Sequence, residues 1–114
     1  MLRWILMLMV AGAVVLAGFA MLAIKSSAGL SYQEAGETEY NWQGAYTYCE
    51  AEGGRLPNVL ELTGLLYRGA LSNQQTDYWS RTGMFGYAFG ANTKSKILSF
   101  DRFSDIDHVV CVRD

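Results

Sequence analysis

The sequence predicts an α+β domain that follows one apolar N-terminal helix. Residues 1–25 are almost wholly apolar, helix-period apolar positions begin at residue 42, and short β-type segments fill the last third of the chain. Helices followed by several strands are typical of the α+β class. The chain has 114 residues, which is room for one domain. We therefore expect a transmembrane anchor or signal segment over residues 1–25, a polar linker over 26–40 and a folded domain over 41–114.

The N-terminal stretch, residues 4–24, carries no charged side chain. As a helix it would span about 31 Å at about 1.5 Å per residue, close to the ~30 Å hydrocarbon core of a bilayer. Arg3 lies before it and Lys25 after it, which favours a cytosolic N-terminus and a domain outside the cytosol. A cleaved secretory signal is the alternative, because small residues follow the stretch. Ala13 and Ala17 have a small-xxx-small spacing, which leaves a helix-mediated homo- or hetero-oligomer open.

The rest of the chain is mildly acidic. The formal net charge is −2, and residues 1–25 carry two positive charges and no negative ones, so the remainder carries −4. A nucleic-acid binder needs a basic surface to neutralise phosphates, and we exclude that class. The composition also excludes a multi-pass membrane protein, a disordered chain and a multidomain enzyme.

Two short helices are predicted in the first half of the domain. The first begins after a potential cap, Asn41, and ends at Gly53 and Gly54. Its apolar stripe is Trp42, Ala45, Tyr46 and Cys49. The second begins after Asn58, which has capping-box spacing to Glu61. Its expected buried face is Val59, Leu62 and Leu66.

A polar loop and several short strands are expected after the helices. Residues 68–76 are polar without periodicity, which favours a loop. The strands beyond it are separated by Gly, Asn, Lys and Asp turns, and residues 92–95 suit a hairpin connection. The expected strands are residues 78–82, 87–91, 97–100 and 109–113.

Cys49 and Cys111 are the only cysteines of the chain. Two cysteines in an exported chain most simply form one disulfide, which here would join the first helix to the last strand. The chain-entropy model assigns so long a loop roughly 4 kcal/mol of stabilisation. A free nucleophile and a metal ligand are the alternatives. A catalytic cysteine needs a nearby base, but in a strand the side chains of Cys111 and the single histidine, His108, would point to opposite faces.

Five short motifs occur in a fixed order along residues 40–114. They are Trp-Gln-Gly-Ala-Tyr-Thr-Tyr-Cys at 42–49, Glu-Gly-Gly-Arg-Leu-Pro at 52–57, Glu-Leu at 61–62, Tyr-Trp-Ser-Arg-Thr at 78–82 and Val-Cys-Val-Arg at 110–113. This combination resembles the bacterial C-type-lectin-like module. It is similar to the C-terminal domains of collagen-like adhesins and to the tip domains of intimin- and invasin-type adhesins, and more distantly to formylglycine-generating enzymes.

The resemblance implies a C-type-lectin-like fold, with two helices packed on a twisted antiparallel sheet and Cys49 paired with Cys111. Together with the apolar N-terminal stretch, it favours a single-pass protein of the bacterial inner membrane with a periplasmic or extracellular domain. Any ligand would contact residues 83–107, between the Trp79 strand and the last strand. The motif residues would be scaffold, namely Trp42, Gly53, Gly54, Arg55, Leu56, Pro57, Glu61, Tyr78, Trp79 and Ser80.

The chain shows no catalytic or metal-binding motif. Sugar-binding C-type lectins hold calcium with Glu-Pro-Asn or Gln-Pro-Asp and Trp-Asn-Asp triplets, and none of these occurs here. Asp101, Asp105 and Asp107 offer oxygen ligands to a hard cation, but we interpret them as solvated turn carboxylates. His108 is interpreted as a strand-edge or surface residue. We expect no enzyme activity, no catalytic residue, no metal and no cofactor.

Residues 83–90 are rich in glycine and aromatic side chains. Aromatic and arginine side chains dominate protein interfaces, so the candidate ligand contacts are Arg81, Phe85, Tyr87 and Arg102. Core filling is the alternative for Phe85 and Tyr87, and it is the interpretation that we favour for Phe89. The sequence favours a non-catalytic, membrane-anchored extracytoplasmic binding module for a protein ligand, with a glycan as second choice. The alternative is a structural accessory subunit of a larger membrane or envelope assembly.

Overall fold

The computed structural model describes residues 18–19 and 21–114. Most of the predicted membrane stretch, with Ala13 and Ala17, lies outside the described residues. Within the described part of the chain, no helix has the length and apolar character needed to cross a bilayer. Residues 21–27 form a short helix that leads into the domain.

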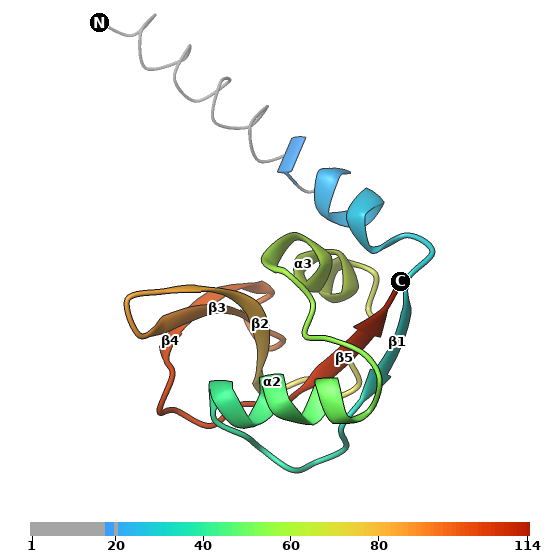
Figure 1. Cartoon of the computed structure of the whole chain (residues 1–114). Coiled ribbons are helices and arrows are strands. Elements are labelled where there is room, and N and C mark those ends of the chain that lie inside the picture. The colour runs from blue at the N-terminus through green and yellow to red at the C-terminus, as the bar shows by residue number, and fades with distance from the viewer. Residues whose placement is uncertain (1–17, 20) are drawn as a thin grey trace, which may run out of the picture.

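The domain belongs to the α+β class, as the sequence predicts (Figure 1). Its strands form two antiparallel sheets, a three-stranded one in the order β2-β3-β4 and a two-stranded one in the order β1-β5. In Figure 1 the three-stranded sheet lies to the left and the β1-β5 pair to the right, with α3 above and α2 below. The elements are β1 (Ser31–Glu34), α2 (Trp42–Ala51), α3 (Val59–Tyr67), β2 (Asp77–Met84), β3 (Tyr87–Asn92), β4 (Ile97–Arg102) and β5 (Val110–Arg113).

The sheet arrangement differs from the single sheet that the resemblance implies. β5 does not join the three-stranded sheet but pairs with β1, from Ser31 opposite Arg113 to Glu34 opposite Val110. A parallel bridge between Tyr78 and His108 links the chain before β5 to β2. The predicted linker therefore contributes a strand to the fold, β1 at Ser31–Glu34, because β5 offers it a free edge.

Both helices begin at the caps that the sequence predicts. The Asn41 side chain accepts a hydrogen bond from the Gly44 N–H at 2.7 Å at the start of α2. At the start of α3, Asn58 Oδ1 accepts from the Glu61 N–H at 2.8 Å, and Glu61 Oε1 accepts from the Asn58 N–H at 2.9 Å. These bonds satisfy N–H groups that have no partner inside the helix. α2 ends where Gly53 takes a φ of +80°, a conformation that glycine adopts without strain.

Two hydrophobic clusters form the core, and β2 contributes to both. Successive side chains of a strand point to opposite faces, so Tyr78 enters one cluster and Trp79 the other. The first cluster joins α3 to the sheets and contains Leu62, Leu65, Leu66, Leu71, Tyr78, Ala91, Val110 and Val112. The second lies beside α2 and contains Ala45, Cys49, Leu56, Trp79, Ala88, Val109 and Cys111.

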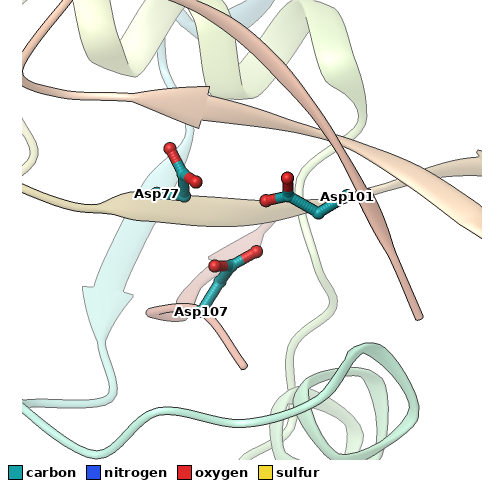
Figure 2. Close-up of side chains that lie close together, drawn as sticks. All are labelled: Asp77, Asp101 and Asp107. Carbon is teal, nitrogen blue, oxygen red and sulfur yellow. The ribbon is translucent and has the colours of Figure 1, made fainter. Parts of the chain in front are cut away.

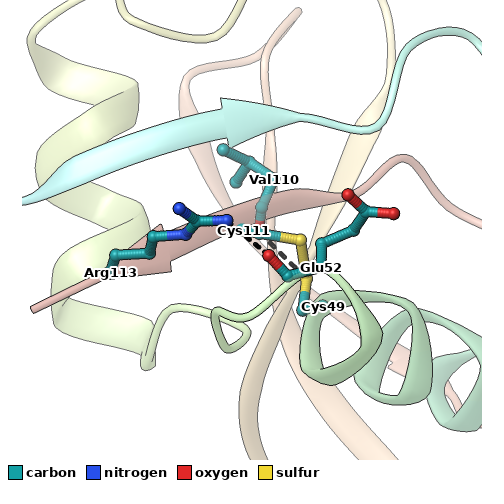
Figure 3. The surroundings of a disulfide bond; sticks show 5 residues. All are labelled: Cys49, Glu52, Val110, Cys111 and Arg113. Carbon is teal, nitrogen blue, oxygen red and sulfur yellow. Dashed lines mark hydrogen bonds between the residues drawn. A yellow bond between two sulfur atoms is a disulfide. The ribbon is translucent and has the colours of Figure 1, made fainter.

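Cys49 and Cys111 form a disulfide, as predicted (Figure 3). Their Cα atoms lie 5.4 Å apart, and the bond ties α2 to β5. The Arg113 guanidinium donates to the carbonyl of Glu52 at the C-terminal end of α2, where a positive charge is favourable. No cysteine among the described residues is free, so neither sulfur atom is available for catalysis or metal binding.

Candidate functional site

Along β3, Tyr87 and Phe89 lie on one face, and Ala88 and Gly90 lie on the other. Ala88 is fully buried in the core, whereas its neighbours Tyr87 and Phe89 are half-buried and belong to neither core cluster. A side chain at Gly90 would bring a Cβ atom to 2.6 Å from Ser99 Oγ and from the Tyr78 carbonyl oxygen. The inner face therefore has no room for a side chain at position 90, and the rings of Tyr87 and Phe89 lie on the opposite, outer face, which is buried only further along the strand at Ala91. The interpretation of Phe89 as a core residue is wrong.

The outer rings form a stacked cluster across β3 and β4. Phe89 lies opposite Phe100 and Tyr87 lies opposite Arg102, and residues opposite each other project from the same face. The ring centroids of Tyr87 and Phe100 are 5.2 Å apart, and those of Phe89 and Phe100 are 4.9 Å apart. Phe100 is 50% exposed. We call the set Met84, Phe85, Tyr87, Phe89, Phe100 and Arg102 the aromatic face.

Phe85 extends the aromatic face at the tip of the β2–β3 hairpin. Its side chain is 93% exposed, so it adds nothing to the core. Phe85 and Gly86 have φ values of +53° and +79°, which is the pattern of a two-residue hairpin turn. Asn, Asp and Gly adopt this conformation readily, but a bulky residue is strained in it. Neither core packing nor the turn geometry explains a phenylalanine at this position.

Three of the four predicted contact residues lie on this face, and Arg81 does not. Phe85, Tyr87 and Arg102 are placed as described, and Arg102 is exposed. The N–H of Arg81 donates to the Pro57 carbonyl at 2.7 Å, which places Arg81 beside the turn into α3. The sequence missed Phe100 and Met84, although Phe100 alternates with polar neighbours along its strand and that pattern is a recognisable signal.

Most motif residues of the resemblance have structural contacts. Trp79 is fully buried, and its indole N–H donates to the Tyr40 carbonyl at 2.7 Å. Trp42 is half-buried; its indole N–H donates to the Ser80 carbonyl at 2.9 Å and its ring stacks on Phe103. The Ser80 hydroxyl donates to the Phe89 carbonyl at 2.6 Å. The Ser80 bond links β2 to β3, and the two indole bonds tie β2 to α2 and to the segment before α2.

Arg55 and Glu61 form a two-pronged ion pair at the start of α3. The guanidinium nitrogens lie 2.7 and 2.9 Å from the two carboxylate oxygens, and Arg55 also reaches Asp114 at 2.7 Å. Burial by itself would raise the pKa of Glu61, but hydrogen bonds from Arg55 and the Asn58 N–H hold that pKa below its usual value. Hydrogen bonding to Glu61, with a smaller contribution from Asp114, raises the pKa of Arg55 above its usual value. This ion pair has a structural role, because it joins the Arg55 segment to the start of α3.

His108 is buried, so its interpretation as a strand-edge or surface residue is wrong. Only 6% of it is exposed, because the bridge to Tyr78 draws it against β2. Its Nε2 lies 3.1 Å from Asn73 Nδ2 and its Nδ1 lies 2.9 Å from Thr76 Oγ1. Glu39 Oε1 also lies 3.7 Å from Nδ1. The bonds to Asn73 and Thr76 hold the loop before β2 in place.

Asp107 is also buried, and its interpretation as a solvated turn carboxylate is wrong. Its carboxylate lies together with those of Asp77 and Asp101, with ligand atoms within 4.8 Å of one another (Figure 2). Burial, together with the neighbouring Asp101 carboxyl, raises the pKa of Asp107 to about 8. Asp105 is exposed and does not belong to this group. The sequence gives no signal for Asp77, which lies far from the other two along the chain.

Comparison with known proteins adds no functional assignment. The sequence matches no protein-family model, and no curated protein matches it.

Proposed function

We propose that this protein is a membrane-anchored, extracytoplasmic binding module that recognises another protein through the aromatic face and catalyses no reaction. The observation that carries the proposal is Phe85, a 93% exposed aromatic side chain in a strained turn, two residues before Tyr87 of a stacked aromatic cluster. Aromatic and arginine residues are enriched where proteins bind proteins. Arg102 beside Tyr87 adds a positive charge at the edge of this surface, which suits a partner with an apolar patch and a neighbouring carboxylate.

The anchor and the location have separate support. The uncharged stretch of residues 4–24 has the length of a membrane span. At its end Met21, Leu22 and Ile24 are 72%, 58% and 45% exposed, and exposed apolar side chains in one short helix favour contact with lipid. The disulfide favours an oxidising compartment, so we place the domain in the periplasm or outside a bacterial cell.

The finer fold proposal is the C-type-lectin-like module. Two helices, antiparallel strands and a disulfide from the first helix of the domain to its last strand are what the resemblance implies. The motif residues Trp79, Leu56 and Pro57 are buried, in keeping with a scaffold role. A glycan ligand is second choice, because the calcium-binding triplets of sugar-binding lectins are missing from the sequence.

Site-specific photocrosslinking in intact cells tests the proposed function. A photoreactive phenylalanine analogue replaces Phe85 in the full chain, and the same analogue replaces Gln43 as the control, since Gln43 is exposed on α2 and does not belong to the aromatic face. The expected result is an adduct with one protein from position 85 and none from position 43. Phe100→Ser, which removes the centre of the ring stack, is expected to reduce that adduct.

Two outcomes would contradict the proposal. One is the absence of any protein adduct at position 85, and the other is equal adducts at positions 85 and 43. Recovery of the same stoichiometric membrane complex from both positions would favour the accessory-subunit alternative instead.

A further inference from the structure

Three carboxylates from distant parts of the chain converge on one side of the three-stranded sheet. Asp77 lies at the start of β2, Asp101 near the end of β4 and Asp107 in the segment before β5. Figure 2 shows the three side chains pointing toward one another. One oxygen of each lies within 4.8 Å of an oxygen of the others. At that spacing a single ion can contact all three carboxylates.

The backbone holds Asp107 at this place from both sides. Its N–H donates to the Tyr40 carbonyl at 2.9 Å, and its carbonyl accepts from the Tyr40 N–H at 2.9 Å. The next residue, His108, donates its N–H to the Asp77 carbonyl at 2.9 Å, so residues 77 and 107 are adjacent. Asp77 is oriented by Asn92, whose amide donates to Asp77 Oδ1 at 2.6 Å. The cluster therefore results from long-range pairing and not from a flexible turn.

The side chains of the cluster lack the partners that buried carboxylates normally have. Asp107 is only 7% exposed, and its Oδ2 is buried without a hydrogen-bond partner. Asp101 Oδ2 is also buried without a hydrogen-bond partner. The same holds for the hydroxyl oxygen of Ser99, which lies on the same face of β4 as Asp101. Within residues 18–19 and 21–114, no lysine, arginine or histidine forms an ion pair with any of the three carboxylates. Buried charges are normally paired or bound to metal.

We propose that Asp77, Asp101 and Asp107 bind a hard divalent cation, with calcium as the first candidate. Carboxylate and hydroxyl oxygens are ligands that calcium and magnesium prefer, and calcium accepts irregular sets that water completes. The site is separate from the aromatic face and does not depend on the proposed protein partner. It departs from the expectation of no metal, because the fold brings Asp77 to Asp101 and Asp107 and buries Asp107.

The competing explanation is a proton shared between the carboxyl groups of Asp107 and Asp101. Close carboxylates that exclude water and cations retain protons instead of ionising together. A shared proton would satisfy one oxygen without any ion. The two explanations differ in their response to calcium, since a bound proton gives no dependence on calcium concentration.

Calcium titration of the full chain in detergent, after removal of metals with a chelator, tests the proposal. The thermal unfolding midpoint is expected to rise with calcium concentration, and calorimetry is expected to show saturable binding near one ion per chain. Extracellular modules bind calcium with dissociation constants of about 10⁻⁴ to 10⁻³ M, which sets the concentration range. Asp107→Asn and, independently, Asp101→Asn are expected to abolish both the shift and the heat.

Asp105→Asn is the matched control, because Asp105 is exposed two residues from Asp107 and outside the cluster. It is expected to bind calcium like the unmodified chain. The proposal is overturned if the unmodified chain shows no calcium-dependent shift, or if Asp105→Asn loses binding while a folded Asp107→Asn or Asp101→Asn chain retains it. The use of two cluster variants keeps the test decisive should one of them fail to fold.

Discussion

At the residue scale, Glu61 links the start of α3 to the Arg55 segment. Its carboxylate caps α3 through the Asn58 N–H and receives both guanidinium nitrogens of Arg55. Arg55 in turn pairs through its backbone with Val112 on β5. Glu61 is only 6% exposed, so a substitution leaves buried donors without an acceptor.

Glu61→Ala is expected to lower the free energy of unfolding by about 2–4 kcal/mol, because the cap and the charge-assisted bonds are lost together. Glu61→Gln keeps an oxygen that can accept from the Asn58 N–H and is expected to lose about half as much. Urea denaturation of both variants measures the difference. Glu50→Ala on the exposed side of α2 is the control and should stay within about 0.5 kcal/mol of the unmodified chain. Equal losses of unfolding free energy in all three variants would contradict a stabilising role of Glu61.

The lowered pKa of Glu61 predicts that the difference in unfolding free energy between the unmodified chain and Glu61→Gln depends on pH. A group whose pKa is lower in the folded state stabilises the fold above its unfolded pKa, here ordinarily 4.5, and loses this contribution as the pH falls through the folded pKa. The gap in unfolding free energy between the unmodified chain and Glu61→Gln should therefore be constant near neutral pH and shrink below about pH 4.5. Urea denaturation of both chains at several pH values measures this gap. A gap that persists unchanged to pH 3 would show that the ionised pair does not supply the stability.

At the element scale, a glycine in α3 allows the helix of residues 21–27 to lie directly against the domain. A Cβ atom at Gly64 would lie 2.5 Å from Ser27 Oγ and would overlap the Ala23 carbonyl oxygen. Ala23 and Ser27 are fully buried, and Arg68 donates to the Ser27 carbonyl at 3.0 Å. Gly64 therefore sets how closely the segment after the predicted anchor packs on the domain.

Gly64→Ala is expected to release this segment. Alanine favours a helix interior by about 1 kcal/mol over glycine, so α3 itself should not be weakened. The clash with Ala23 and Ser27 should instead expose the bond after Lys25 and speed its cleavage by trypsin in the full chain. Gly44→Ala in α2 is the control, since its Cβ would meet only the side chains of Asn41 and Tyr40, at 3.0 Å or more. Unchanged cleavage in Gly64→Ala would contradict the packing.

At the scale of the whole molecule, two small sheets and two core clusters depend on a few long-range links. The disulfide joins α2 to β5 across a sequence separation of 62 residues, and β5 holds β1 along its edge. The bridge between Tyr78 and His108 connects this half to the three-stranded sheet. A domain of this size has little stability in reserve, so the covalent link is a large part of it.

Cys49→Ser combined with Cys111→Ser is expected to lower the free energy of unfolding by roughly 4 kcal/mol, the value of the chain-entropy model for a loop of this length. A reductant should cause a similar loss in the unmodified chain and none in the double variant. Urea denaturation with and without reductant measures both effects. If the reductant changes the unmodified chain and the double variant alike, the stabilisation does not come from this bond.

Local features of the domain could be predicted because they depend on neighbouring residues. Asn41 and Asn58 cap their helices through side-chain bonds to residues three positions on, and the strands follow short β-type segments between turns. The disulfide could be predicted because the chain offers only two cysteines. For the site, residue type was enough to name Phe85, Tyr87 and Arg102 as candidate contacts. It was not enough to place Phe89 outside the core clusters, because alternation alone does not say which face is buried.

The sequence by itself determined the α+β class, the helix caps, the turn positions and the choice of cysteines, since each depends on residue type and short spacing. Only the tertiary structure decided that β5 pairs with β1, that His108 and Asp107 are buried, and that Asp77 joins Asp101 and Asp107. Those outcomes depend on which distant segments hydrogen-bond to each other. The physical reason is that backbone pairing is largely independent of side-chain identity, so the partner of a strand is selected by the packing of the whole core.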